Sequence, residues 1–206
     1  DAQESRGLGD VYKRQEKEIV NSNDILLTDY LDKTAIKRLN NGGKVLLSLK
    51  KGTLKDEYGG NLAIGFSSIF WNTSWTNGQA PHTLGILCNP KHPALAAFPT
   101  EYHSNYQWWD AMTHSAPIRI NKVSKEAQPI VRVIDDWFSN HPLALLFEVK
   151  IGKGKLLVSG IDFHRDMQMR PAARQLLSSL LNYMQSSDFS PRHIVKIETI
   201  NDLIDK

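Results

Sequence analysis

The chain of 206 residues lacks most of the features that mark specialised classes of protein. Its single cysteine, Cys88, excludes an internal disulfide and a zinc site built from several cysteines. No apolar run approaches the roughly 20 residues that a membrane-spanning helix needs. Lysine and arginine are scattered and the formal net charge is only +3, so no dense basic segment points to nucleic acid. The sequence therefore predicts neither a membrane nor a nucleic-acid partner.

The beginning of the chain differs in character from the rest. It starts with aspartate rather than methionine and shows no signal peptide. Residues 5–15 (SRGLGDVYKRQ) resemble translated sequencing-adapter read-through, so we expect residues 1–15 to be non-native; a polar, frayed terminus is the alternative. We expect one α/β domain over residues 16–186, followed over residues 187–206 by a tail or a linker to a following domain.

The first half of this domain has a strand–helix–strand pattern. Residues 23–28 (NDILLT) and 44–49 (KVLLSL) are short apolar runs that indicate buried strands. Between them, Asp32 is a good N-cap for a helix, and Gly42 and Gly43 supply its C-terminal stop. Two strands joined by a helix predict parallel pairing with a right-handed crossover.

The second half predicts a hairpin and a long helix. Residues 143–150 and 155–161 flank Gly152-Lys153-Gly154, which is a strong hairpin signal. The run from Leu156 to Ile161 is almost continuously apolar, as in strands that are covered on both faces. After Pro171, leucines recur with helical spacing up to Met184 and predict a helix that covers a sheet.

A polar segment follows the second strand of the hairpin, and open α/β sheets usually bind ligands at such strand ends. Asp162 and His164 stand two residues apart, so an extended backbone presents them on one face. Together with Asp166 they can ligate a metal or grip a sugar hydroxyl. The alternative is a capping and salt-bridge loop ahead of Arg170.

Other candidate catalytic residues fit poorly with known chemistry. Cys88 lies in the context Leu-Cys-Asn-Pro, without the small residues that a strained nucleophile elbow requires, so we expect a buried structural cysteine. Asp135 and Asp136 are adjacent, and adjacent residues of a strand face opposite sides, so they cannot flank one glycosidic bond. The histidines show no metal-site spacing, and the sequence indicates no cofactor.

Aromatic residues in polar segments are the most informative feature. Trp71, Trp75, Trp108 and Trp109 lie among asparagine, serine, threonine and histidine rather than in regular apolar stripes. Flat rings with neighbouring hydroxyls and amides suit sugar rings and also suit a protein interface. The alternative is packing of long loops onto the core.

Two longer stretches resemble a known group of proteins. Residues 82–112, with the motif FPTEYHSNYQWWD, and residues 128–184 are similar to the C-terminal region of bacterial family 2 glycoside hydrolases of the β-galactosidase-like, sugar-binding type. The resemblance implies a three-layer α/β fold with a mostly parallel sheet and flanking helices. Such a fold is flavodoxin-like, or like a class I glutamine amidotransferase without its catalytic residues, with an antiparallel hairpin at the C-terminal end of the sheet.

The resemblance also implies a function. In those enzymes the catalytic glutamates lie on a preceding (β/α)8 barrel, so no catalytic residue carries over to this chain. We expect a non-catalytic accessory domain in a periplasmic or secreted enzyme that supports the barrel of its parent chain, forms a homo-oligomer or contacts a glycan. A stand-alone hydrolase that uses Asp162 and His164, or a pure assembly module, is the alternative. The candidates for carbohydrate contact are Trp71, Trp75, His103, Trp108, Trp109, Asp162 and His164.

Overall fold

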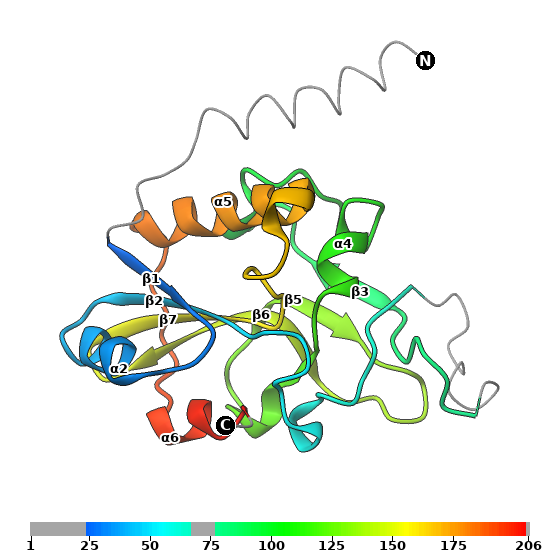
Figure 1. Ribbon diagram of the computed structural model, residues 1–206, viewed down its shortest axis with the longest axis horizontal. Coiled ribbons are helices and arrows are strands. Elements are labelled where there is room, and N and C mark those ends of the chain that lie inside the picture. Colours follow the sequence, from blue (N-terminus) through cyan, green and yellow to red (C-terminus); the bar gives the residue numbers. More distant parts are fainter. Residues whose placement is uncertain (1–23, 67–76, 205–206) are drawn as a thin grey trace, which may run out of the picture.

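The structure, a computed structural model, describes residues 24–66 and 77–204 (Figure 1). The strands of this part are β1 (Ile25–Thr28), β2 (Lys44–Ser48), β3 (Gly85–Cys88), β4 (Ile118–Arg119), β5 (Pro129–Ile134), β6 (Leu143–Ile151) and β7 (Gly154–Ser159). The α-helices are α2 (Lys33–Asn40), α4 (Trp108–Thr113), α5 (Pro171–Gln185) and α6 (Ile197–Asn201). Short 3-10 helices η1 (Asp56–Tyr58), η2 (Pro93–Leu95), η3 (Ile120–Lys122) and η4 (Met167–Met169) lie in the connections.

In the described part of the chain, all these strands form one mixed sheet in the order β1-β2-β7-β6-β5-β3, with β4 paired to β6. Of the six strand pairings there, only β1–β2 and β2–β7 are parallel. The prediction of a flavodoxin-like, three-layer fold with a mostly parallel sheet is therefore wrong. The sheet is mixed and mostly antiparallel, and helices are few.

The error has a physical cause in the connections. A continuous apolar run shows that both faces of a strand are covered, but it does not show in which direction the strand runs. Direction follows from the connecting chain, because parallel neighbours need a crossover of about a dozen residues or more. The β6–β7 turn and the β5–β6 loop at residues 135–142 are shorter than that, so they force antiparallel pairing.

The predictions of the strand–helix–strand unit, the hairpin and the long helix are confirmed. β1, α2 and β2 form the parallel unit, and the Asp32 carboxylate caps α2 by accepting a 2.7 Å hydrogen bond from the Ala35 amide. β6 and β7 form the predicted hairpin around Gly152 and Lys153. The helix predicted after Pro171 is α5.

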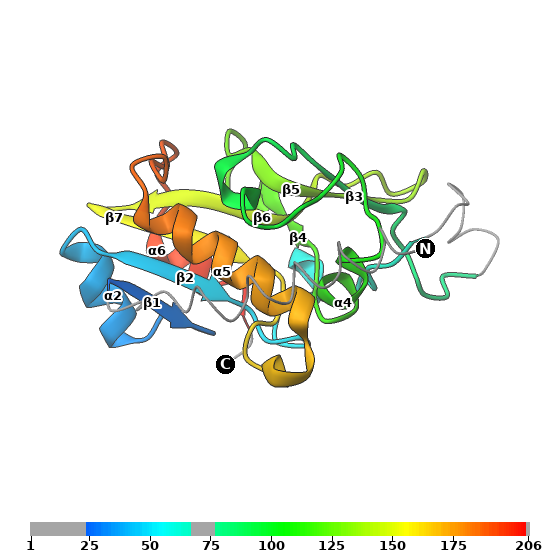
Figure 2. The same ribbon diagram turned by 90° about the horizontal axis from the view of Figure 1, so that it is seen from above.

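Two apolar cores lie on opposite faces of the sheet. Leu157 of β7 faces the core under α5, whereas its neighbours Leu156 and Val158 face the core that α2 and α6 cover. Figure 1 shows α5 above the sheet and α2 and α6 below it, and the view from above shows α5 lying along the sheet face (Figure 2). This alternation with period two explains why the central strands read as continuously apolar.

Residues 187–204 belong to the same folded unit as the sheet. Phe189, Ile200 and Leu203 are fully buried in the two cores. The backbone of the segment also bonds to β6, where the Lys150 amide donates to the His193 carbonyl at 2.7 Å and the Val195 amide donates back to Lys150 at 2.9 Å. The stretch that the sequence presented as a tail or linker thus packs against the sheet.

The contact between the hairpin and α2 leads to a test of the packing. A Cβ atom at position 154 would stand 2.5 Å from both the Cα and the carbonyl oxygen of Leu39. Gly154→Ala must therefore push α2 away from the sheet, and we expect a loss of about 1–3 kcal/mol in the free energy of unfolding. Lys153→Ala, in the exposed turn, is the matched control. Equal stability of the two variants in urea denaturation would contradict this packing.

Candidate functional site

Asp162 follows β7 at the edge where the parallel strands β1 and β2 also end. Its carboxylate is 1% exposed and accepts hydrogen bonds from the amides of His164 (2.9 Å), Arg165 (3.1 Å) and Lys51 (3.3 Å). Burial by itself raises the pKa of Asp162, but these three amides lower it below the ordinary aspartate value. The side chain holds two loops together and presents no free oxygen to a ligand.

His164 is engaged in the same way. Its Nε2 atom lies 3.0 Å from the Ser48 carbonyl oxygen, which can only accept, so Nε2 donates. Asp162 and His164 therefore behave as parts of a capping loop, the second of the two possibilities that the sequence left open. In the described residues, no group of three histidine, cysteine, aspartate or glutamate side chains is placed to hold a metal ion.

Trp108 lies in the core rather than at the surface. Its side chain is 0% exposed, its Nε1 donates to the Thr100 hydroxyl at 2.7 Å, and its ring meets Phe98 edge-on with centroids 5.0 Å apart. A ring without an exposed face cannot stack on a sugar, so Trp108 is corrected from a contact candidate to a core residue. Trp108 is the first residue of α4, and its ring points inward into the core under α5.

Trp109, the next residue, faces outward. It is 55% exposed and stacks almost parallel on Phe66, with ring centroids 5.5 Å apart and planes at 10°. His103 is also exposed, and its backbone pairs with Leu87 beside β3. Trp71 and Trp75 lie outside the described residues. Of the aromatic candidates, Trp109 thus keeps the geometry that stacking requires.

The loop between β5 and β6 holds two further exposed rings. Asp135 accepts hydrogen bonds from the amide and Nδ1 of His141, and Asp136 accepts from the amides of Phe138 and Ser139. These short bonds fix a tight turn on which Trp137 is 69% and Phe138 is 63% exposed. Both carboxylates are buried and serve this turn, which agrees with the argument against a paired-carboxylate catalyst.

Cys88 is buried, as the sequence predicts. Its thiol lies 3.3 Å from the Glu101 carbonyl oxygen and donates to it. Burial raises the pKa of Cys88, although the Thr100 hydroxyl opposes this, and a raised pKa disfavours the reactive thiolate. The structural assignment of this cysteine therefore holds.

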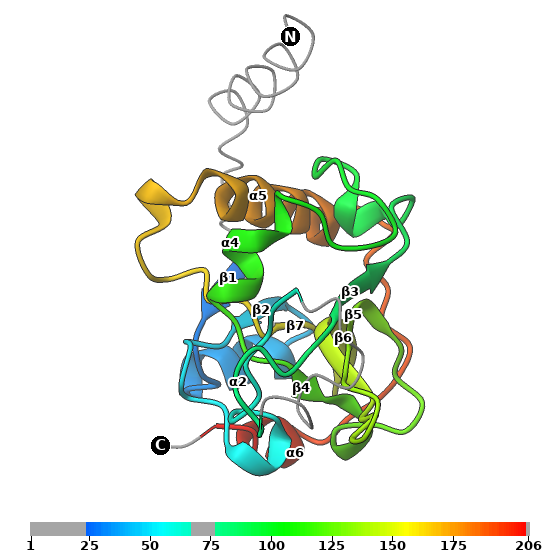
Figure 3. The ribbon, with the colours of Figure 1, turned by 90° about the vertical axis from the view of Figure 1, so that its right-hand side faces the viewer.

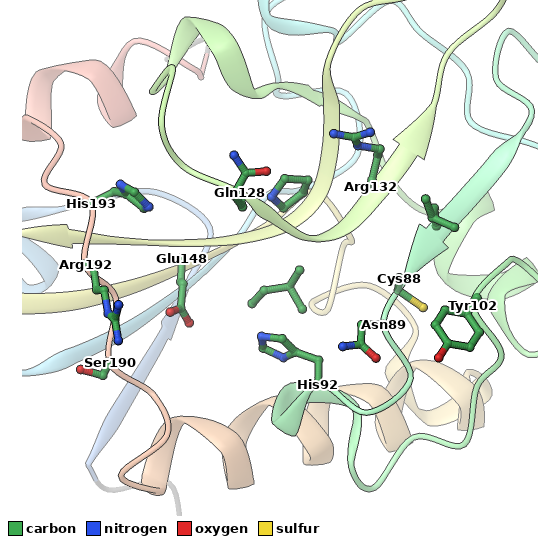
Figure 4. Close-up of a pocket in the computed structure, with 13 residues that line it drawn as sticks. Cys88, Asn89, His92, Tyr102, Gln128, Arg132, Glu148, Ser190, Arg192 and His193 are labelled. Carbon is green, nitrogen blue, oxygen red and sulfur yellow. The ribbon is translucent and has the colours of Figure 1, made fainter.

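A cleft of about 580 Å³ lies between β3, β5, β6 and residues 190–193, and sequence reasoning missed it (Figure 4). Figure 4 shows Glu148 and His92 near its middle, Tyr102 and Asn89 toward one end, and Arg192 toward the other. In Figure 3, β3 is green and the chain that follows α5 is orange to red, so these two sides of the cleft come from distant parts of the sequence. The cleft forms only when the two halves of the chain meet.

Glu148 is the unusual residue of this cleft. It stands in the central strand β6 on the face of the sheet toward α5, half-buried, and its Oε2 accepts a 2.7 Å hydrogen bond from the Tyr183 hydroxyl of α5. Burial raises the pKa of Glu148, while the hydroxyl of Tyr183 and the charges of Lys155 and His193 partly oppose the shift. The one carboxylate in the otherwise largely apolar run LALLFEVKI was the available signal, since a buried acid needs a partner.

His92 completes the middle of the cleft. Its Nδ1 accepts a hydrogen bond from the Ala94 amide at 3.2 Å, and its ring meets the Tyr183 ring edge-on at 5.5 Å. Burial lowers the pKa of His92, so the ring is neutral at physiological pH with its proton on Nε2. Imidazole thus offers a hydrogen-bond donor, and the adjacent glutamate offers an acceptor.

Comparison with known families matches residues 26–205 to a family described as a domain of unknown function (DUF8487). The chain belongs to the DUF8487 family. The matched stretch includes every described element from β2 to α6 and all the residues of the cleft. A search of curated proteins gave no match. Among the described residues, no helix combines the length and apolar character needed to cross a membrane.

The raised pKa of Glu148 leads to a test of its environment. The folded protein keeps the Glu148 proton to a higher pH than the unfolded chain, so this contribution to stability is full below the ordinary glutamate pKa. It is lost as pH rises through the raised pKa of the folded state. Glu148→Gln, which cannot ionise, should therefore gain stability relative to the natural protein over that pH interval. The measurement is urea denaturation at several pH values.

Glu198→Gln, an exposed change on α6, is the control for this measurement. If the stability difference for Glu148→Gln followed pH no more steeply than that for Glu198→Gln, the environment assigned to Glu148 would be incorrect.

Proposed function

We propose that this chain is a non-catalytic accessory domain of a carbohydrate-degrading enzyme of the family 2 glycoside hydrolase type. The catalytic barrel of the parent chain and a glycan are its partners, in a periplasmic or secreted setting. The observation that carries the proposal is the exposed ring of Trp109, which stacks on Phe66. The likeness of residues 82–112 and 128–184 to such enzymes also supports it.

The geometry of Trp109 supports contact with a sugar. An aromatic face packs well on the apolar face of a pyranose, and stacking on Phe66 fixes the ring so that little side-chain entropy is lost on binding. Neighbouring polar groups are available from the exposed His103 and Tyr106 of the same segment. A rigid flat ring among polar groups is the arrangement that sugar contact requires.

A different observation favours an assembly role in the same protein. Trp137 and Phe138 project from a turn that Asp135 and Asp136 hold rigid. Adjacent exposed aromatic residues on a fixed loop are typical anchors of a protein interface. We propose the barrel of the parent chain, or a second copy of this domain, as the partner that covers them.

The alternative of a stand-alone hydrolase finds less support. It requires Asp162 and His164 to reach a substrate, whereas Asp162 is buried and both side chains are engaged by backbone groups. We therefore retain the accessory role as the proposal.

The first test is hydrolysis. Because the barrel that carries the two catalytic glutamates in the resembling enzymes is not part of these 206 residues, we expect the purified chain to release no nitrophenol from an aryl-galactoside. Turnover that co-purifies with the chain and is abolished by His164→Ala would replace the accessory role by the hydrolase alternative.

The second test is glycan binding at Trp109. We expect Trp109→Ala to weaken the binding of galacto-oligosaccharides by about 1–3 kcal/mol in calorimetric titration, because the stacking face is removed. Trp137→Ala is the matched control, since it removes an exposed tryptophan elsewhere. Equal affinities of the natural protein and Trp109→Ala would mean that Trp109 only packs on Phe66 and does not contact the glycan.

A further inference from the structure

The cleft around Glu148 is lined mainly by groups that donate hydrogen bonds. Arg192 brings a guanidinium group from the chain after α5, and His92 offers its Nε2 proton. Arg132 lines the cleft from the other face of β5, because its neighbours Val131 and Val133 both face the core under α5. Asn89 and Gln128 add amides that both donate and accept. A ligand that satisfies this lining must present several acceptors.

Charge narrows the choice of ligand. Arg132 and Arg192 outnumber the single carboxylate of the lining, Glu148, so the lining carries a net positive charge. A concave site concentrates such a field and attracts anions. Planar guanidinium groups bind carboxylates in a bidentate manner, more strongly than neutral acceptors. The lining therefore favours a ligand with a carboxylate.

Glu148 adds a second requirement. Its Oε2 is occupied by the Tyr183 hydroxyl, and its partial burial makes a further hydrogen-bond donor favourable at the carboxylate. A simple carboxylate would offer no donor and would be repelled there. A ligand that carries hydroxyl groups beside its carboxylate satisfies both Arg192 and Glu148.

We propose that this cleft binds a uronic acid unit, a pyranose ring that bears a carboxylate. The carboxylate lies toward Arg192, the ring hydroxyls donate to Glu148 and accept from His92, and the half-exposed ring of Tyr102 forms an apolar wall. The volume of about 580 Å³ is within the usual range for small-ligand sites. The identification of the ligand as part of a glycan rests on the proposed function, whereas the cleft and its charge do not.

The test compares three disaccharides of equal length by calorimetric titration of the full chain: digalacturonate, its methyl ester and uncharged galactobiose. We expect digalacturonate to bind about ten-fold more tightly than the other two, because only it offers a charged partner to Arg192. Acetate serves as a carboxylate without a sugar ring and should not compete at equal concentration. Equal affinities for the three disaccharides, or full competition by acetate, would overturn the proposal.

Variants locate the site. Arg192→Gln keeps a polar side chain on an exposed position, so the fold tolerates it, and it should lower the affinity for digalacturonate about ten-fold without changing that for galactobiose. Lys37→Gln, which removes an exposed positive charge from α2 on the opposite face of the sheet, is the control. Digalacturonate binding that Arg192→Gln does not weaken would place the site elsewhere and overturn the proposal.

The two proposals fail in different ways. If galactobiose binds and Trp109→Ala weakens it, while digalacturonate shows no preference, the uronate site is wrong and the glycan-binding role stands. If digalacturonate binds through Arg192 and no neutral sugar binds, the uronate site stands and the role of Trp109 is wrong.

Discussion

Burial of both faces of one sheet is the constraint on which the rest of this structure depends. In β6 and β7 successive side chains enter opposite cores, so helices or loops must cover both sides. α5 covers one side, and α2 with α6 covers the other. Residues 187–204 supply part of the second covering layer, so this segment must fold back onto β6 to bury that face of the sheet.

This constraint also explains why Glu148 stands out. A carboxylate on a buried face of a central strand is costly unless it finds a hydrogen bond or water. Tyr183 provides the hydrogen bond from α5, and the open cleft provides access to solvent or ligand. The pairing ties the covering helix to the cleft, so the position of α5 and the polarity of the site depend on each other. Polar residues that stability alone does not favour often mark functional positions.

Most of the other buried acids have a local role. Asp135, Asp136 and Asp162 each accept hydrogen bonds from amides within a few residues of themselves, which is how short carboxylates shape turns, and Asp162 accepts one more from the distant Lys51 amide. From the sequence they look like catalytic or ligand-binding candidates because they follow strands. The structure shows that these hydrogen bonds occupy their oxygens. The hydrogen bond to the longer side chain of Glu148 comes instead from Tyr183, 35 positions away.

What the sequence alone determined was local: the N-cap at Asp32, the β1–α2–β2 unit, the hairpin around Lys153 and the buried Cys88. These features depend on residues that are close together in the chain, so the local sequence pattern is enough to predict them. Strand direction across the sheet, the inward turn of Trp108 and the cleft around Glu148 were decided only by the tertiary structure. Each depends on which distant segments meet, and apolar runs that are covered on both faces look the same in parallel and antiparallel sheets.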